Sequence, residues 1–266
     1  MFNTRMVTFW LQKDGSHPHE WEDGAMGDVG DVGRGRNPRF VLADGATEAY
    51  DAIRWVDHLV TSFTDQDGDA PELDPPSMLR WFTAVQQAWV AAAPQTFGTI
   101  FEEHAFADGS FATLLGCEIR DADGPAPWWR AVALGDTVLF HVRRGALLVH
   151  FPPLAPDDFG LHPDGVDTRP AALPLMMQQL TSANHGLQSD DELFLATDAL
   201  AEWILRTRQL EGDGRVWDFL SHLSHPDVFA QFVADSRVAG VMKNDDVTLM
   251  RILVSESDPE LVVVCL

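Results

Sequence analysis

The stretch Arg39-Phe40-Val41-Leu42-Ala43-Asp44-Gly45 decides the fold class of this chain. Its short apolar run is typical of a buried β-strand, and the run stops at an aspartate followed by a glycine. The same arrangement returns at Glu192-Leu193-Phe194-Leu195-Ala196-Thr197-Asp198, where a second apolar run ends at an aspartate. Each run therefore predicts a strand that delivers a carboxylate at its carboxyl end.

Helices and further strands are expected around these two runs. Helical spacing of apolar residues appears at 50–63, 78–89 (with Ser77 as the expected N-cap), 198–205, 216–223 and 228–238. Strand patterns appear at 7–11, 111–119, 128–134, 137–142, 146–151, 247–254 and 261–265. The four strands from 111 to 151 predict an antiparallel meander, and 152–174 predicts a long surface connection. Strands grouped with strands, and helices in consecutive pairs, favour an α+β layered sandwich with a single domain over 1–266.

Composition excludes several classes of function. Acidic residues outnumber basic ones by 41 to 18, and the net charge of -23 disfavours binding to nucleic acid or to an anionic membrane. No apolar run approaches the roughly 18 residues that span a bilayer, and 1–14 contains no apolar stretch of signal-peptide length, so we expect a cytoplasmic protein. The two cysteines, Cys117 and Cys265, form neither a zinc–thiolate cluster nor a disulfide framework.

Carboxylates at the ends of predicted strands are the candidates for chemistry. Glu22, Asp23, Asp44, Asp198 and Asp245 offer the oxygen ligands that Mg²⁺ and Mn²⁺ prefer. Two such ions a few Å apart can activate a water molecule and hold a phosphoryl group during in-line attack. One aspartate after a strand is usually a turn former or a helix cap, so the order of the motifs carries the argument.

Six short motifs, spread over nearly the whole chain, occur in the order found in one enzyme family. They are Trp21-Glu22-Asp23-Gly24-Ala25, Val41-Leu42-Ala43-Asp44-Gly45, Gly109-Ser110-Phe111-Ala112-Thr113, Ala133-Leu134-Gly135-Asp136-Thr137, Leu193-Phe194-Leu195-Ala196-Thr197-Asp198-Ala199-Leu200 and Lys243-Asn244-Asp245-Asp246-Val247-Thr248. In this order they resemble the metal-dependent type 2C protein phosphatases, the PPM family, of bacterial type.

The resemblance implies a fold and a metal site. The fold is a four-layer αββα sandwich, with two antiparallel sheets flanked by helix pairs. The cofactors are two divalent cations, Mn²⁺ or Mg²⁺. Asp44 would bridge both ions, with Glu22 and the Gly45 carbonyl on one ion and Asp198 and Asp245 on the other. The water between the ions would be the nucleophile, which makes Asp44 and Asp198 the central catalytic carboxylates.

The activity implied is that of a phosphoserine/phosphothreonine protein phosphatase acting on a phosphoprotein, and we expect a monomer. Four positions depart from the family pattern. Pro18 stands where an arginine often holds the substrate phosphate, and Ala46-Thr47 follows Asp44-Gly45 where a histidine is common; Ala199 replaces a glycine, and Asp246 replaces an asparagine. These departures support an alternative, a catalytically weak or inactive phosphatase-like binding or regulatory module.

The absent arginine needs a replacement among the nearby basic groups. Arg34 and Arg36 lie at the end of the glycine-rich loop that begins at Gly24, which is expected to fold over the site, and a guanidinium matches phosphate bidentately. His19 is a further candidate for the phosphate. Asp136 is expected to fix a turn between strands, and Asp108 is a candidate ligand for a third, weaker ion.

Overall fold

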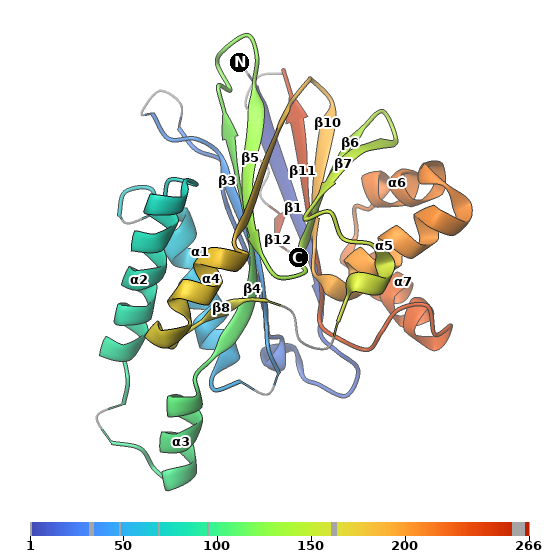
Figure 1. The fold of residues 1–266 in the computed structure, drawn as a ribbon. Helices are drawn as coiled ribbons and strands as arrows, with labels where there is room; N and C mark the ends of the chain where they lie inside the picture. The colour runs from blue at the N-terminus through green and yellow to red at the C-terminus, as the bar shows by residue number, and fades with distance from the viewer. Residues whose placement is uncertain are drawn as a thin grey trace.

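The computed structural model describes residues 2–31, 35–47, 49–68, 70–94, 96–160, 164–256 and 264–265. Within these residues, two six-stranded sheets face each other, and helices cover both outer faces (Figure 1). One sheet has the order β12-β1-β11-β10-β6-β7, and the other has the order β2-β3-β4-β5-β9, with β8 paired to β4. The α+β sandwich with four layers is confirmed.

The strands of the first sheet are β1 (Asn3–Leu11), β6 (Val138–Arg143), β7 (Ala146–Phe151), β10 (Asp191–Ala196), β11 (Val247–Ser255) and β12 (Val264–Cys265). Those of the second sheet are β2 (Asp23–Asp28), β3 (Arg39–Gly45), β4 (Phe111–Arg120), β5 (Trp128–Leu134), β8 (Val166–Asp167) and β9 (Thr181–Gly186). Neighbouring strands pair antiparallel, except that β12 runs parallel to β1. Strand β11 therefore brings the C-terminal part of the chain beside β1.

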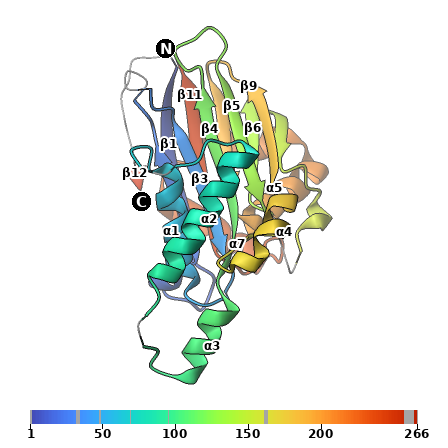
Figure 2. The same ribbon diagram turned by 60° about the vertical axis from the view of Figure 1, so that its left-hand side comes forward.

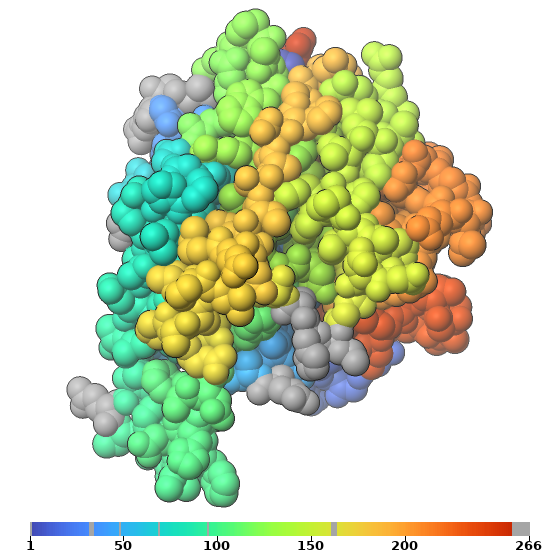
Figure 3. Space-filling view, in the orientation of Figure 1, coloured from blue at the N-terminus to red at the C-terminus, as the bar shows by residue number. Residues whose placement is uncertain are grey.

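The helices are α1 (Ala52–Thr64), α2 (Pro75–Ala91), α3 (Ile100–Asp108), α4 (Leu173–Gln179), α5 (Asp198–Glu211), α6 (Asp213–His222) and α7 (Pro226–Val238). Short 3-10 turns occupy Pro18–Glu20, Pro156–Asp158 and Pro170–Ala172. Helices α1 and α2 lie across the outer face of the β3–β4–β5 sheet (Figure 2). Helix α3 stands out from the body of the molecule (Figure 3). No helix among the described residues is long and apolar enough to cross a membrane.

Three cores fill the spaces between the four layers. Phe40 and Leu42 of β3 face the core between the two sheets, whereas Val41 and Ala43 face the core under α1 and α2. Because β3 is buried on both faces, its sequence reads as a continuous apolar run rather than an alternating one. A third core, which includes Trp217, lies between the other sheet and α5, α6 and α7.

The expected meander from 111 to 151 is wrong, because its strands divide between the sheets. Strands β4 and β5 pair in one sheet, and β6 and β7 pair in the other. The chain crosses over at residues 135–137, where Gly135 has a φ of +111°. A Cβ at Gly135 would lie 2.5 Å from the carbonyl oxygen of Asp164, so the crossover requires glycine.

Two local expectations are also corrected. The N-cap of α2 is Asp74, whose side chain accepts a hydrogen bond from the Ser77 N–H at 3.0 Å. The helix starts before Ser77 because Pro75 and Pro76 fit the first turn, where no N–H is needed. The segment 152–174 contains β8 and the start of α4 as well as loop, and β2, α3 and β9 have no counterpart in the sequence prediction.

Candidate metal centre

Strand register brings Asp23 and Asp44 to the same end of the second sheet. The two residues are directly paired across β2 and β3, and Asp28 pairs with Arg39 at the opposite end of this hairpin. Directly paired residues of antiparallel strands have side chains on the same face. Asp44 continues the alternation of Phe40 and Leu42, so both carboxylates face the space between the sheets.

The first sheet delivers its carboxylates to the same end of the sandwich. Strand β10 ends at Ala196 and α5 begins at Asp198, while Asp245 lies two residues before the start of β11 at Val247. Ala196 pairs with Leu249, which places both carboxylates at one edge of the sheet. The Thr248 hydroxyl of β11 donates to Asp23 Oδ2 at 2.7 Å and so ties the two sheets together at this end.

A cavity of about 780 Å³ opens where these strand ends meet. Among the predicted metal ligands, Asp44, Gly45, Asp198 and Asp245 line it. Asp108, at the exposed end of α3, lines it as well. A Cβ at Gly45 would lie 2.7 Å from the Glu22 carbonyl oxygen, so the close approach of the two chain segments requires glycine here.

Glu22, which the resemblance implies as a metal ligand, is paired with a lysine in this structure. Its carboxylate forms an ion pair with Lys13 Nζ at 2.8 Å, and Lys13 also donates to the Thr47 hydroxyl. The Glu22 side chain is not among the described residues that line the cavity. The neighbouring Asp23 is the carboxylate beside Asp44. The alternation of side chains along a strand would have pointed to Asp23, had β2 been predicted.

Asp245 and Asp246 point to different surroundings, as neighbours at a strand entrance must. Asp246 is buried and accepts hydrogen bonds from the backbone N–H groups of Lys13 (2.7 Å) and Glu22 (2.6 Å). Asp245 lines the cavity, with its Oδ2 3.3 Å from Lys243 Nζ. Asp246 therefore fastens the 12–22 loop, and Asp245 faces the site.

Burial and mutual repulsion perturb the carboxylates of the cluster. Burial, with the charges of Asp23 and Asp198, raises the pKa of Asp44 well above its ordinary value. Burial also raises the pKa of Asp23 well above its usual range, although the Thr248 hydroxyl opposes this shift. Burial and the charge of Asp198 raise the pKa of Asp136 to about 7. Such shifts mean that the ionised carboxylates lack sufficient positive charge around them.

Comparisons with known proteins bear on the architecture. No protein-family model matches the sequence, and no curated protein is similar to it in sequence. Solved structures match it over nearly its whole length. The catalytic domain of the serine/threonine protein phosphatase PstP in complex with two manganese ions gives a TM-score of 0.58 at 16% identity, covering 96% of this chain and 100% of that chain. The chain has the type 2C phosphatase fold.

Two further structures show the same likeness. A bacterial serine phosphatase gives a TM-score of 0.61 at 11% identity, covering 96% of this chain and 99% of that chain. RsbX in complex with magnesium gives 0.52 at 12% identity, covering 95% of this chain and 96% of that chain. At these identities the type 2C phosphatase fold is what the likeness establishes, and the chemistry must be argued from the site.

The donor set at this end of the type 2C fold suits a hard divalent cation. Four buried carboxylate oxygens lack a hydrogen-bond partner among the described residues: Asp23 Oδ1, Asp136 Oδ1, Asp136 Oδ2 and Asp198 Oδ1. Unpartnered carboxylates are expensive to bury, and a cation supplies the missing charge. Asp136 was expected to fix a turn, yet both of its oxygens are among these four. The side chains do not converge closely, because no three acidic, histidine or cysteine side chains of the described residues are placed to hold one ion.

One ammonium group already contacts this cluster. Lys243 Nζ lies against Asp198 Oδ2 and 3.3 Å from Asp245 Oδ2. Burial opposes the charged form of Lys243, but the two carboxylates outweigh it and raise the pKa of Lys243. Sequence reasoning did not assign this lysine, because its contact with Asp198 depends on the tertiary fold.

Arg36, one of the groups predicted to bind phosphate, lies away from the cavity, which corrects the position expected for it. Arg36 is at the far end of the β2–β3 hairpin and pairs with Asp67 at 2.9 Å. Arg34 falls outside the described residues. His19 is exposed and stacks on His17, with ring centroids 5.4 Å apart. Sequence reasoning missed Arg169, whose guanidinium lines the cavity and binds Asp167 through Nη2 at 2.6 Å.

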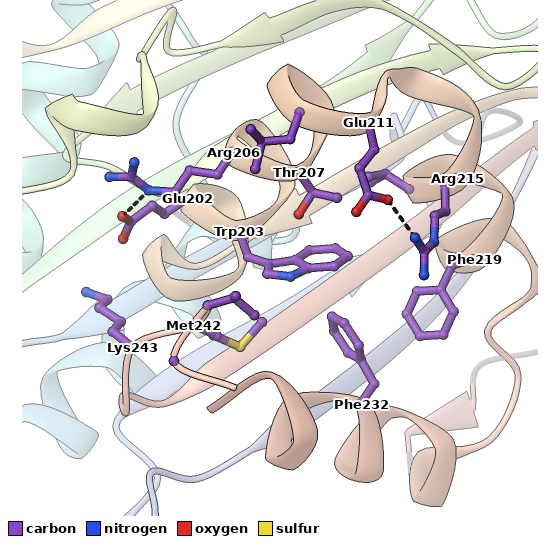
Figure 4. A pocket seen from close by; sticks show the side chains of 14 residues that line it. Glu202, Trp203, Arg206, Thr207, Glu211, Arg215, Phe219, Phe232, Met242 and Lys243 are labelled. Atoms are coloured by element: carbon purple, nitrogen blue, oxygen red, sulfur yellow. Dashed lines mark hydrogen bonds and ion pairs between the residues drawn. The ribbon is translucent and has the colours of Figure 1, made fainter. Parts of the chain in front are cut away.

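A second cavity, of about 770 Å³, lies between α5, α6 and α7 (Figure 4). Its wall combines aromatic residues with arginine–glutamate pairs, and none of the predicted metal ligands lines it. Lys243 stands at one edge, and its ammonium is directed away from the aromatic rings. The carboxylates and their cavity therefore remain the candidate site.

Proposed function

We propose that this chain is a metal-dependent phosphatase that hydrolyses phosphoserine and phosphothreonine in proteins. The observation that carries the proposal is the set of buried carboxylate oxygens without partners on Asp23, Asp136 and Asp198. Asp198 lines a large cavity together with Asp44. The likeness in fold to serine/threonine phosphatases supports it, and one of those structures is a complex with two manganese ions.

Each carboxylate has a definite place in the proposed reaction. Asp44, fixed by its pairing with Asp23 at the end of β3, would hold a cation from the side of the second sheet. Asp198, at the first turn of α5, would hold a second cation from the side of the other sheet. Mn²⁺ or Mg²⁺ bound here would polarise the phosphoryl group and supply an activated water. The cavity admits the phosphorylated side chain to these groups.

Arg169 is the group that we propose in place of the absent phosphate-binding arginine. It lines the same cavity as Asp44, and its side chain is 56% exposed, so it can reach an entering ligand. Its bidentate contact with Asp167 fixes the guanidinium without burying it. A phosphate dianion needs such donors in addition to metal ions if it is to be held in line.

The alternative, a phosphatase-like module that binds but does not turn over, has its own support. Lys243 contacts Asp198 and Asp245, the two carboxylates implied for one of the two ions. Pro18 also stands where the family often has an arginine. Both features affect catalysis without affecting the fold.

The deciding experiment is hydrolysis of an aryl phosphate and of a phosphothreonine peptide by the purified protein with Mn²⁺, and again after chelation. Turnover that requires Mn²⁺ and disappears in Asp44→Asn supports the enzyme. The variant is the matched control, because a contaminating phosphatase would give the same turnover in both preparations. Metal binding without turnover on either substrate would select the binding module.

A further inference from the structure

The chain has only two lysines, Lys13 and Lys243, and each pairs with a carboxylate that was predicted to bind metal. Lys13 pairs with Glu22, outside the cavity lining. Lys243 reaches further in, because its ammonium contacts Asp198 and Asp245 together. Its side chain is 37% exposed, so the contact is partly shielded from water.

The backbone around Lys243 is fixed by several hydrogen bonds. The Asn244 side chain accepts from the Asp14 N–H at 2.7 Å, and Arg237 Nη2 donates to the Asp245 carbonyl at 2.6 Å. Arg237 is itself held by Gln12 and Asp14. These bonds fasten residues 243–246 to the 12–14 loop and to α7. The ammonium is therefore delivered to the two carboxylates from a fixed support.

The same two carboxylates are those that would hold the second of two divalent cations. An ammonium between them supplies positive charge where that ion would lie, and a lysine and a divalent ion repel each other at such distances. Lys243 must leave both oxygens before an ion can take them. By contrast, Asp23 Oδ1 has no partner among the described residues, which leaves that part of the cluster open to a metal.

We propose that Lys243 is an internal cation at the second metal position, so that the chain holds one divalent ion tightly and admits a second only weakly. The proposal rests on the metal site of the proposed function, whose other half is Asp44 and Asp23. It makes Lys243 a positioning residue that sets the number of ions bound.

The test is a titration of the full chain with Mn²⁺, by calorimetry and by electron paramagnetic resonance, for wild type, Lys243→Met and Lys243→Arg. Wild type should bind one tight ion and show the spectrum of an isolated Mn²⁺. Lys243→Met should bind a second ion on the order of 10- to 100-fold more tightly than wild type does, the size of effect typical of groups that contact metal ligands. Its spectrum should show a coupled pair. Lys243→Arg retains the charge and should behave as wild type.

Two tight ions in wild type, or an unchanged second affinity in Lys243→Met, would overturn the proposal. The wild-type measurement stands alone if Lys243→Met does not fold. Binding is measured without substrate, so this result is separate from that of the turnover assay. One tight ion without turnover would defeat the proposed function and support the role of Lys243. Two tight ions with turnover would support the proposed function and overturn the role of Lys243.

Discussion

Two groups of buried carboxylates in this sandwich differ in how their charge is compensated. Asp191, at the start of β10, is fully buried and accepts from Arg143 (2.7 and 2.8 Å) and from His141 Nε2 (2.8 Å). His141 Nδ1 accepts from the indole N–H of Trp129 in the opposite sheet, so the imidazole is neutral and its Nε2–H donates to Asp191. At the other group, Asp23 and Asp136 are equally enclosed but keep oxygens without partners.

The pKa values of the two groups move in opposite directions for this reason. Although burial opposes ionisation, the hydrogen bonds from Arg143 and His141 lower the pKa of Asp191 to about 2. Burial and the charge of Asp198 raise the pKa of Asp136 to about 7, and the charge of Lys243 opposes this shift only in part. A buried carboxylate that lacks a partner destabilises a fold strongly, and a partner or a bound cation removes this penalty. The comparison separates a structural cluster from a functional one.

The largest expected effect is that of Asp44→Asn, which removes one charge from the unpaired cluster. Mn²⁺ affinity should fall by more than the ~100-fold that is typical of losing a group outside the ligands, and turnover should reach background. The metal-free protein should not lose stability, because the substitution relieves repulsion. Calorimetry, turnover and urea unfolding with chelator measure the three quantities. Wild-type affinity and rate in the variant would show that the site is elsewhere.

A comparison of Asp245→Ala with Asp246→Ala should separate a site residue from a structural one. Asp245→Ala should lower turnover by about 10- to 100-fold with little loss of stability. Asp246→Ala removes the acceptor of two backbone N–H groups and should lower the free energy of unfolding by about 1–3 kcal/mol. It should retain more activity than Asp245→Ala. The reverse order would move the assignment by one residue.

The contribution of the Asp191 ion pair to the free energy of unfolding should be lost in acid. The folded pKa of Asp191, about 2, lies below the ordinary value near 3.9, so its contribution is present above about pH 4 and is lost as the pH falls toward 2. Wild type should lose about 2 kcal/mol over this range relative to Asp191→Asn. Urea unfolding of both proteins at several pH values measures the difference. Parallel curves would mean that the ion pair with Arg143 does not stabilise the fold.

The smallest effect concerns Arg169, the arginine that lines the candidate site and pairs with Asp167. Arg169→Met should raise the KM for a phosphopeptide by about tenfold, which is the affinity lost with one charge-assisted hydrogen bond. The affinity for Mn²⁺ should stay unchanged. Arg36→Met is the matched control at the far end of the β2–β3 hairpin and should leave KM as in wild type. If Arg36→Met alone raised KM, the glycine-rich loop would reach the substrate after all.

Sequence patterns anticipated the strands that carry Asp44 and Asp198, because both are uninterrupted apolar runs with clear ends. They did not reveal β2, whose residues Gly24 and Gly27 obscure its strand character. Those glycines are required by packing: a Cβ at Gly24 would lie 2.3 Å from Val56, and one at Gly27 would lie 2.3 Å from Met6. With β2 unrecognised, Asp23 could not be placed opposite Asp44.

Other features depend on contacts that local patterns do not encode. The sequence at Gly135, where the chain crosses from one sheet to the other, is the same as that of an ordinary hairpin turn. Asp136 was therefore interpreted as a turn residue. The contact between Lys243 and Asp198 joins residues 45 positions apart. Arg169 lies in a segment without periodicity and reaches the cavity through the pairing of β8 with β4.

The central claim is that the unpaired carboxylates form a cation site, and the most direct test is the unfolding free energy as a function of Mn²⁺ concentration. Binding to the folded state alone should raise it by about 2.7 kcal/mol when Mn²⁺ reaches 100 times its dissociation constant. Asp44→Asn should abolish most of this gain, and Asp191→Asn should preserve it. A wild-type stability that does not change with Mn²⁺ would contradict the account.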